Sequence, residues 1–185
     1  MNKFFINIPD VDKDNFLSDK YGGNASNDLL IDGLSHLSPE ISWSPVDGAK
    51  SYALEFIDYD SSSACGLVFV HWVVANINKT KLEFNASLKD KTILQGVNSC
   101  TDGHYKNLSL SDEEKKIVNL KNSNYVGPCP PNSDHLYTFR VYALDIEKLN
   151  LVQPYFIGDL HFLMQNHIIS EARLDIKYKH VKPKK

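Results

Sequence analysis

The chain has 185 residues and a mass of 21.0 kDa, and 42% of its residues are hydrophobic and 23% charged, which predicts one domain spanning residues 1–185. A net charge of -3 and a pI near 6.1 exclude the overall positive field that would hold nucleic acid or an anionic membrane. A mean hydropathy of -0.32, with no apolar run of the ~20 residues that cross a bilayer, excludes an integral membrane protein.

The first ten residues contain only a short apolar patch, which Asn7 interrupts and Pro9 ends. This patch is too short for a secretory signal peptide, so we expect a cytoplasmic protein. The chain has three widely spaced cysteines, Cys65, Cys100 and Cys129. Their spacing fits neither a disulfide framework nor a zinc site, so we expect free thiols, with no metal and no cofactor.

Two strands are predicted in the first half of the chain. Residues Ser51 to Asp58 alternate in polarity, which is typical of a strand in a sheet with unequal faces. Residues Leu67 to Ile77 are almost continuously apolar and β-branched, which predicts a strand covered on both faces. We place Trp43 in the core for the same reason as Trp72, because both lie in strand-like settings.

The second half adds two helices and a strand. Ser111 and Glu114 form a capping-box pattern, which predicts a short surface helix over 111–121. The segment Tyr137–Leu144 alternates in polarity, which predicts another strand and completes the pattern of an antiparallel β-sandwich. Apolar residues spaced three and four apart from Leu160 to Ala172 predict a C-terminal helix that Asp159 caps, followed by a frayed basic tail over 178–185.

Several side chains that could bind a ligand or take part in catalysis lie in or near these strands. Asp58 and Asp60 end one strand, and His71 lies inside the next, where a buried imidazole needs a hydrogen-bond partner. A hairpin between the two strands would bring these groups together. Taken alone, His71 is more often a satisfied core residue, and the aspartates are equally typical of a turn.

A series of motifs in a fixed order carries a resemblance to a known family. The motifs are Leu37–Trp43, Gly48–Leu54, Asp58-Tyr59-Asp60, His71–Asn76, Gln95–Ser99, Tyr125–Pro131 and His135–Phe139. In this order they resemble the phosphatidylethanolamine-binding protein family, and most closely its bacterial and archaeal branch, the Raf kinase inhibitor-like proteins. The resemblance runs from about residue 16 to residue 178.

The resemblance implies a mainly β fold, an antiparallel β-sandwich with a C-terminal helix, and here also a short helical insertion. It implies a small anion pocket at one end of the sandwich, without catalysis, for phosphate, phosphorylethanolamine headgroups or carboxylates. It also implies a possible homodimer and a possible kinase or protease partner that the protein would inhibit. Carried over position by position, the pocket residues are Asp58, Asp60, His71, Cys129, Pro130, His135 and Tyr137.

Three departures from the family pattern stand out. The aspartate loop lacks the two prolines that the family usually has there, which predicts a looser pocket rim. Leu136 stands where the family usually has an arginine, which removes a positive charge. An insertion over about 101–122 precedes the proline-rich turn, which is Gly127–Pro131. The insertion is interpreted either as a solvated loop, which is favoured, or as a lid or partner surface.

Catalysis at the same pocket is the alternative. His71, His135 and Asp58 could form a metal-dependent hydrolase site, and Cys129 beside His135 could act as a thiol nucleophile. The chain has none of the HExxH, GxSxG, Walker A or GxGxxG patterns, so a non-catalytic binding protein is favoured.

Overall fold

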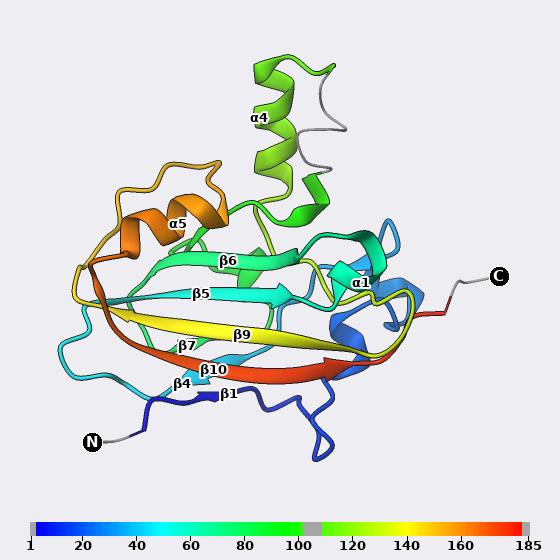
Figure 1. The fold of residues 1–185 in the computed structure, drawn as a ribbon, viewed down its shortest axis with the longest axis horizontal. Helices are drawn as coiled ribbons and strands as arrows, with labels where there is room; N and C mark the ends of the chain where they lie inside the picture. The colour runs from blue at the N-terminus through cyan, green and yellow to red at the C-terminus, as the bar shows by residue number, and fades with distance from the viewer. Residues whose placement is uncertain (1–2, 102–108, 183–185) are drawn as a thin grey trace.

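The computed structural model describes residues 3–101 and 109–182, and an antiparallel sheet of five strands dominates it (Figure 1). The strands lie in the order β10-β9-β5-β6-β8, so β5 is central and the apolar strand β6 is also interior. The predicted strands are confirmed, each with ends shifted by at most two residues. The bounds are β5 Ser51–Asp58, β6 Phe69–Ile77, β8 Leu94–Gln95, β9 His135–Leu144 and β10 Ile168–Tyr178.

A second sheet covers one face of the large one. It has the strand order β1-β4-β7, all antiparallel, and a separate β2-β3 hairpin completes the strands. The architecture is therefore the predicted antiparallel β-sandwich. The bounds are β1 Ile6–Asn7, β2 Leu30–Ile31, β3 Leu34–Ser35, β4 Ile41–Trp43 and β7 Lys81–Leu82.

Short helices connect the strands. Two of them, α1 and η3, stand on either side of β6, and both lie near one end of the large sheet. The bounds are η1 Asp19–Tyr21, η2 Asn27–Leu29, α1 Ser61–Cys65, α2 Ala86–Lys89, η3 Ser99–Thr101, α4 Asp112–Lys121 and α5 Ile157–Met164.

Both faces of the large sheet are buried, which explains why β5 is buried along its whole length. On one face, Leu54 and Phe56 join the main core between the two sheets, together with both tryptophans. On the other face, Ala53 belongs to a second core, which includes Leu160 of α5. The alternation in the sequence therefore separates two apolar cores rather than a core from solvent.

The predicted C-terminal helix is wrong beyond Met164. Helix α5 ends there, and Ile168–Tyr178 forms strand β10, which pairs with β9 from Leu144 to His135. The apolar residues of this segment fit both the 3.6-residue period of a helix and the two-residue period of a strand. In the strand, the backbone N–H and C=O groups that face β9 form hydrogen bonds with it. The predicted capping by Asp159 is confirmed, because its carboxylate accepts a hydrogen bond from Phe156 N at the start of α5.

The capped helix of the insertion is confirmed as α4. Ser111 Oγ accepts from Glu114 N at 3.3 Å and Glu114 Oε2 accepts from Ser111 N at 2.8 Å, which completes the capping box. Helix α4 projects from the body of the molecule (Figure 1), and it has no buried residue. The first part of the insertion, 102–108, lies outside the described residues.

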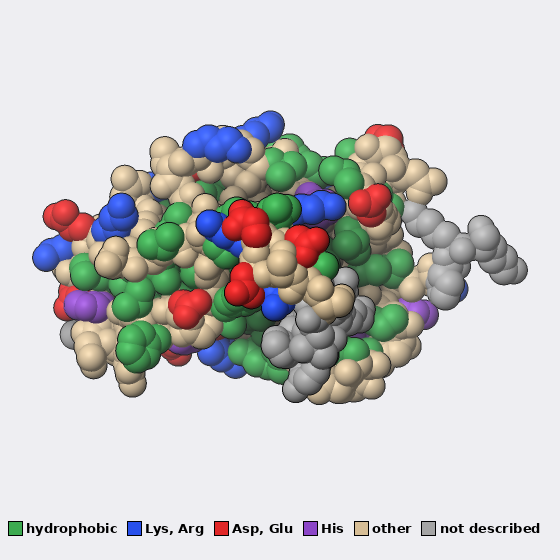
Figure 2. Space-filling view, turned by 90° about the horizontal axis from the view of Figure 1, so that it is seen from above, with side chains coloured by type: hydrophobic (Ala, Val, Ile, Leu, Met, Phe, Trp, Pro, Cys, Tyr) green, Lys and Arg blue, Asp and Glu red, His purple; other side chains and the backbone are tan. Residues whose placement is uncertain are grey.

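Asn98 holds the base of the insertion. Asn98 N donates to Asn122 O and Asn98 Nδ2 donates to Asn124 O, both at 2.9 Å. The surface around α4 mixes acidic, basic and apolar side chains (Figure 2), as the balanced charge of the chain predicts.

The tail differs from the expected frayed end. Tyr178 is fully buried, Val181 N donates to Pro130 O at 2.9 Å, and His180 N donates to Asp134 Oδ1 at 2.8 Å. Residues 178–182 therefore pack beside the proline-rich turn, and 183–185 lie outside the described residues.

Candidate functional site

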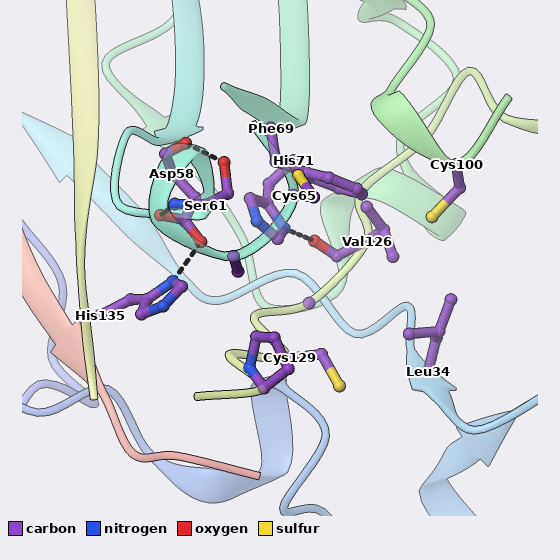
Figure 3. A pocket seen from close by; sticks show the side chains of 13 residues that line it. Leu34, Asp58, Ser61, Cys65, Phe69, His71, Cys100, Val126, Cys129 and His135 are labelled. Atoms are coloured by element: carbon purple, nitrogen blue, oxygen red, sulfur yellow. Dashed lines mark hydrogen bonds and ion pairs between the residues drawn. The ribbon is translucent and has the colours of Figure 1, made fainter. Parts of the chain in front are cut away.

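A cavity of about 310 Å³ opens at the end of the sandwich where β5 ends and β6 begins (Figure 3). Its walls come from α1, the start of β6, η3, the proline-rich turn and the start of β9, so segments far apart in sequence meet here. The lining residues are Leu34, Asp58, Ser61, Ala64, Cys65, Phe69, His71, Cys100, Val126, Gly127, Cys129, Pro131 and His135.

Asp58 organises the wall formed by α1. Its Oδ1 accepts from Ser61 N at 2.9 Å, and Ser61 Oγ lies 2.8 Å from Asp58 O and 2.6 Å from Leu67 O. These contacts turn the chain into α1 directly after the strand, as an aspartate commonly does in a tight turn. The loop is thus held by hydrogen bonds in place of the missing prolines, and the looser rim stays a prediction.

Asp60 fixes the same loop from outside. It is exposed, it does not line the cavity, and its Oδ2 accepts from Leu136 N at 2.9 Å. Leu136 itself is 40% exposed and is also absent from the cavity lining. Leu136 therefore lies outside the cavity wall, and the effect of replacing the usual arginine stays a prediction.

His135 forms a buried pair with Asp58. Its Nδ1 lies 2.8 Å from Asp58 Oδ2 and its Nε2 lies 2.7 Å from Asn132 Oδ1. Both partners are oxygen acceptors, so both imidazole N–H groups are used within the protein when the ring carries two protons. The pair anchors the start of β9 to the end of β5.

His71 lies at an irregularity in the β5–β6 ladder. Phe56 pairs with Trp72 and Ile57 pairs with Val70, so His71 is the extra residue between them, and such bulges often redirect a side chain. Its Nδ1 lies 2.8 Å from Val126 O, and its own carbonyl accepts from Val126 N at 3.0 Å. The proline-rich turn is thereby docked directly onto this strand.

The environment of His71 sets its protonation. Burial lowers the pKa of His71 to about 4, and the opposing influence of the hydrogen bond to Val126 and of the nearby Asp58 is smaller. The ring is therefore neutral at neutral pH, and because a carbonyl only accepts, Nδ1 carries the hydrogen. Nε2 is then an acceptor, and within the described part of the chain it makes no hydrogen bond.

The other predicted residues lie behind the wall or on it. Tyr137 is fully buried beside both histidines, its hydroxyl has no hydrogen-bond partner of ordinary geometry among the described residues, and burial together with Asp58 raises its pKa. Pro130 is buried, and the neighbouring Pro131 lines the cavity in its place. Cys129 lines the cavity as predicted. Four of the seven predicted residues thus reach the lining.

No pattern in the sequence marks the apolar character of the cavity. Leu34, Phe69 and Val126 belong to a wall that exposes almost only carbon and sulfur, and no lysine or arginine belongs to the lining. Cys65 and Cys100 also reach the wall, although they lie on different elements. Their convergence depends on tertiary packing, and no local pattern marks it.

The described residues contain neither a metal-binding cluster nor a membrane-spanning helix. Among residues 3–101 and 109–182, no three histidine, cysteine, aspartate or glutamate side chains are placed to share a metal ion. None of the helices described is both long enough and apolar enough to cross a membrane.

Comparison with known proteins places this fold in a family. The family model described as phosphatidylethanolamine-binding protein matches residues 7–179. The chain belongs to the phosphatidylethanolamine-binding protein family. Membership supports a ligand-binding role in general.

Individual relatives agree with this placement. The chain is similar to the protein YxkA of Bacillus subtilis, with 35% identity over 170 residues that cover 90% of this chain and 95% of the relative. A UPF0098 protein of Methanothermobacter thermautotrophicus is 37% identical over 147 residues, covering 75% of this chain and 80% of the relative. The crystal structure of a putative phosphatidylethanolamine-binding protein homologue, CT736 from Chlamydia trachomatis, shares the fold with a TM-score of 0.73, 24% identity and coverage of 98% and 100%.

Proposed function

We propose that the protein binds a small molecule in this cavity without transforming it, and that the ligand has one polar head, phosphorylated or otherwise anionic, and an apolar portion. The observation that carries the proposal is the division of the cavity: Asp58, His71 and His135 gather at one side, while the remaining wall exposes carbon and sulfur. Few polar groups in a largely apolar cavity are typical of small-molecule sites.

The hydrogen bonds inside the site restrict how an anionic head would bind. Both ring nitrogens of His135 face oxygen atoms of Asp58 and Asn132, and the N–H of His71 faces Val126. The position that remains at the polar side is the acceptor Nε2 of His71. An anion facing this atom is repelled unless a proton lies between them, so the ligand brings its own acidic hydrogen or His71 becomes protonated.

The free-energy cost of protonating His71 follows from its pKa of about 4. Charging a group three pH units above its pKa costs about 4 kcal/mol at pH 7, and the attraction of an anion offsets this cost within the complex. Binding of a dianionic phosphate is then accompanied by proton uptake, so its affinity rises as the pH falls. A headgroup that binds in its protonated form gives the same rise in affinity as the pH falls.

Support for a role without catalysis comes from the same contacts. Asp58 and His135 are occupied by each other and by the neighbouring loop, rather than aimed at a nucleophile. A homodimer, a kinase or protease partner and a cytoplasmic location remain predictions from the sequence and the resemblance.

The test is calorimetric titration of phosphorylethanolamine and of inorganic phosphate at pH 7 and pH 8, in buffers with different ionisation enthalpies. We expect saturable binding, uptake of about one proton per ligand, and a roughly tenfold weaker affinity at the higher pH. His71→Asn should abolish the proton uptake, because the amide supplies the donor to Val126 but has no group that titrates.

His167→Asn is the matched control, because its Nδ1 lies 2.8 Å from Asp145 Oδ1 at the surface, outside this cavity. This variant should bind as the wild type does. Absence of binding of either compound by a folded wild-type protein would contradict the proposal, and so would binding that is insensitive to His71→Asn.

A further inference from the structure

All three cysteines of the chain line the same cavity. Cys65 comes from α1, Cys100 from η3 and Cys129 from the proline-rich turn, so they surround the space from three separate elements (Figure 3). The lining is formed by only 13 of the 185 residues. Three cysteines scattered at random would rarely all fall within so small a set.

Ordinary structural roles do not account for this convergence. No disulfide joins any of the three, and no three potential ligands in the described part of the chain are placed to hold a metal ion. Packing is an incomplete explanation, because a cysteine that acts as a small apolar filler is usually buried. Cys65 and Cys129 are exposed, and Cys100 is half-buried.

We propose that the cavity is a thiol-modification site in which Cys129 reacts with small uncharged disulfides, and that the attached group occupies the space of the reversible ligand. The inference does not depend on which ligand the cavity binds. An uncharged aliphatic reagent suits the wall, which offers carbon and sulfur and no basic side chain.

The surroundings of the two exposed cysteines differ in a way that favours Cys129. Cys65 Sγ donates to Leu67 O at 3.5 Å, so its thiol hydrogen is held by the loop that follows α1. Cys129 lies on a turn held by Gly127 N, which donates to Ser35 O at 2.8 Å, and by the bond from Val181 N to Pro130 O. Its sulfur is thus presented on a fixed part of the wall.

A donor for the thiolate of Cys129 is also at hand. The hydroxyl of Tyr137 is buried, and its pKa is raised first by burial, then by Asp58 and then by Cys129, so the phenol lies near both of these groups. A phenolic O–H stabilises a neighbouring thiolate, which is the nucleophilic form.

The reaction is a thiol–disulfide exchange that needs no other reactant. The Cys129 thiolate attacks one sulfur of the reagent, the S–S bond of the reagent breaks, and a new S–S bond joins Cys129 to half of the reagent. The leaving thiolate takes up the proton that the Cys129 thiol has lost. Cys129 is oxidised and the leaving half is reduced, so electrons balance.

The experiment treats the whole protein with 2-hydroxyethyl disulfide and follows the adduct by intact mass and peptide mapping over time. We expect one group to add first, at Cys129, at least about tenfold faster than at Cys65 in the same molecule. Dithiothreitol should remove it. Mapping on the wild type needs no variant, so a folding defect cannot obscure the result.

Variants distinguish a specifically reactive thiol from one that reacts only because it is exposed. Cys129→Ser should eliminate the fast adduct, whereas His167→Asn, a surface variant outside the cavity, should leave its rate unchanged. Tyr137→Phe should slow it and move its pH-rate profile to higher pH, because the thiolate loses its donor. Equal labelling of Cys65 and Cys129, or a fast adduct that persists in Cys129→Ser, would overturn the inference.

Phosphorylethanolamine titration of the labelled protein completes the test. Where the unlabelled protein binds this compound, labelling should reduce its affinity at least about tenfold, and unchanged affinity would overturn the blocking role. Rapid labelling of a protein that does not bind the compound would contradict the proposed function and leave Cys129 as the modification site.

Discussion

His71 and Val126 exchange two hydrogen bonds: Val126 N donates to the His71 carbonyl at 3.0 Å, and His71 Nδ1 donates to Val126 O at 2.8 Å. The pair joins strand β6 to the proline-rich turn, and it also fixes the tautomer of the imidazole. The same contact therefore builds a wall of the cavity and determines that Nε2 accepts rather than donates.

The buried His71 should make folding sensitive to acid. Its pKa is about 4 in the folded state and about 6.5 in an unfolded chain, so the unfolded state binds the extra proton as the pH falls through this window. The contribution is fully present above pH 6.5 and falls by about 3 kcal/mol by pH 4. Urea unfolding of the wild type and His71→Asn at pH 7.5 and pH 4.5 measures it.

Only the difference between the two proteins reports on His71, because other groups titrate in both. The wild type should lose more free energy of unfolding than His71→Asn does between these pH values. Identical losses would show that His71 is not held neutral by burial.

Asp58 should contribute far more to stability than a surface aspartate with the same geometry. Asp58→Ala leaves His135 and Ser61 N without their partner inside the protein, and we expect a loss of about 3 kcal/mol. Asp145→Ala removes a pair with His167 of the same 2.8 Å length, but both side chains are well exposed, so we expect less than about 1 kcal/mol. Denaturant midpoints at pH 7 decide between these values.

Gly127 should tolerate no side chain. A Cβ at this position would lie 2.1 Å from Tyr21 O, a backbone atom that cannot yield without moving the turn away from η1. Gly127→Ala should therefore cost about 3 kcal/mol or more, and weaken ligand binding because the turn forms the cavity wall.

Gly158→Ala provides the matched control for this substitution. Gly158 lies in α5 with no atom within 4 Å of the added carbon, and alanine should stabilise the helix by about 0.5–1 kcal/mol. Thermal unfolding of both variants is the measurement. Equal effects would show that the close approach at Gly127 does not constrain the turn.

Removal of the insertion distinguishes a solvated loop from a lid. No residue of 109–122 lines the cavity, so replacing 102–121 by a short glycine-serine link should leave phosphorylethanolamine affinity within about twofold of the wild type. Calorimetric titration checks this, with Asn98 and Asn122 retained because they close the base of the insertion. A change of tenfold or more would support the lid.

The sequence by itself determined the elements whose signals are local. Alternation in Ser51–Asp58, the apolar run before Ile77 and the capping box at Ser111 each depend on neighbours within one strand or one helical turn, and each element is present. The motif order also located Asp58, His71, Cys129 and His135, and these four share the cavity.

Tertiary structure decided the rest, because its partners lie far apart in the chain. Residues 168–178 form a strand rather than a helix since β9 offers a continuous ladder, and a local period cannot reveal that partner. The acceptor role of His71 follows from Val126, 55 residues away. The apolar wall and the meeting of three cysteines likewise arise only when separate loops pack around one space, so no local pattern encodes them.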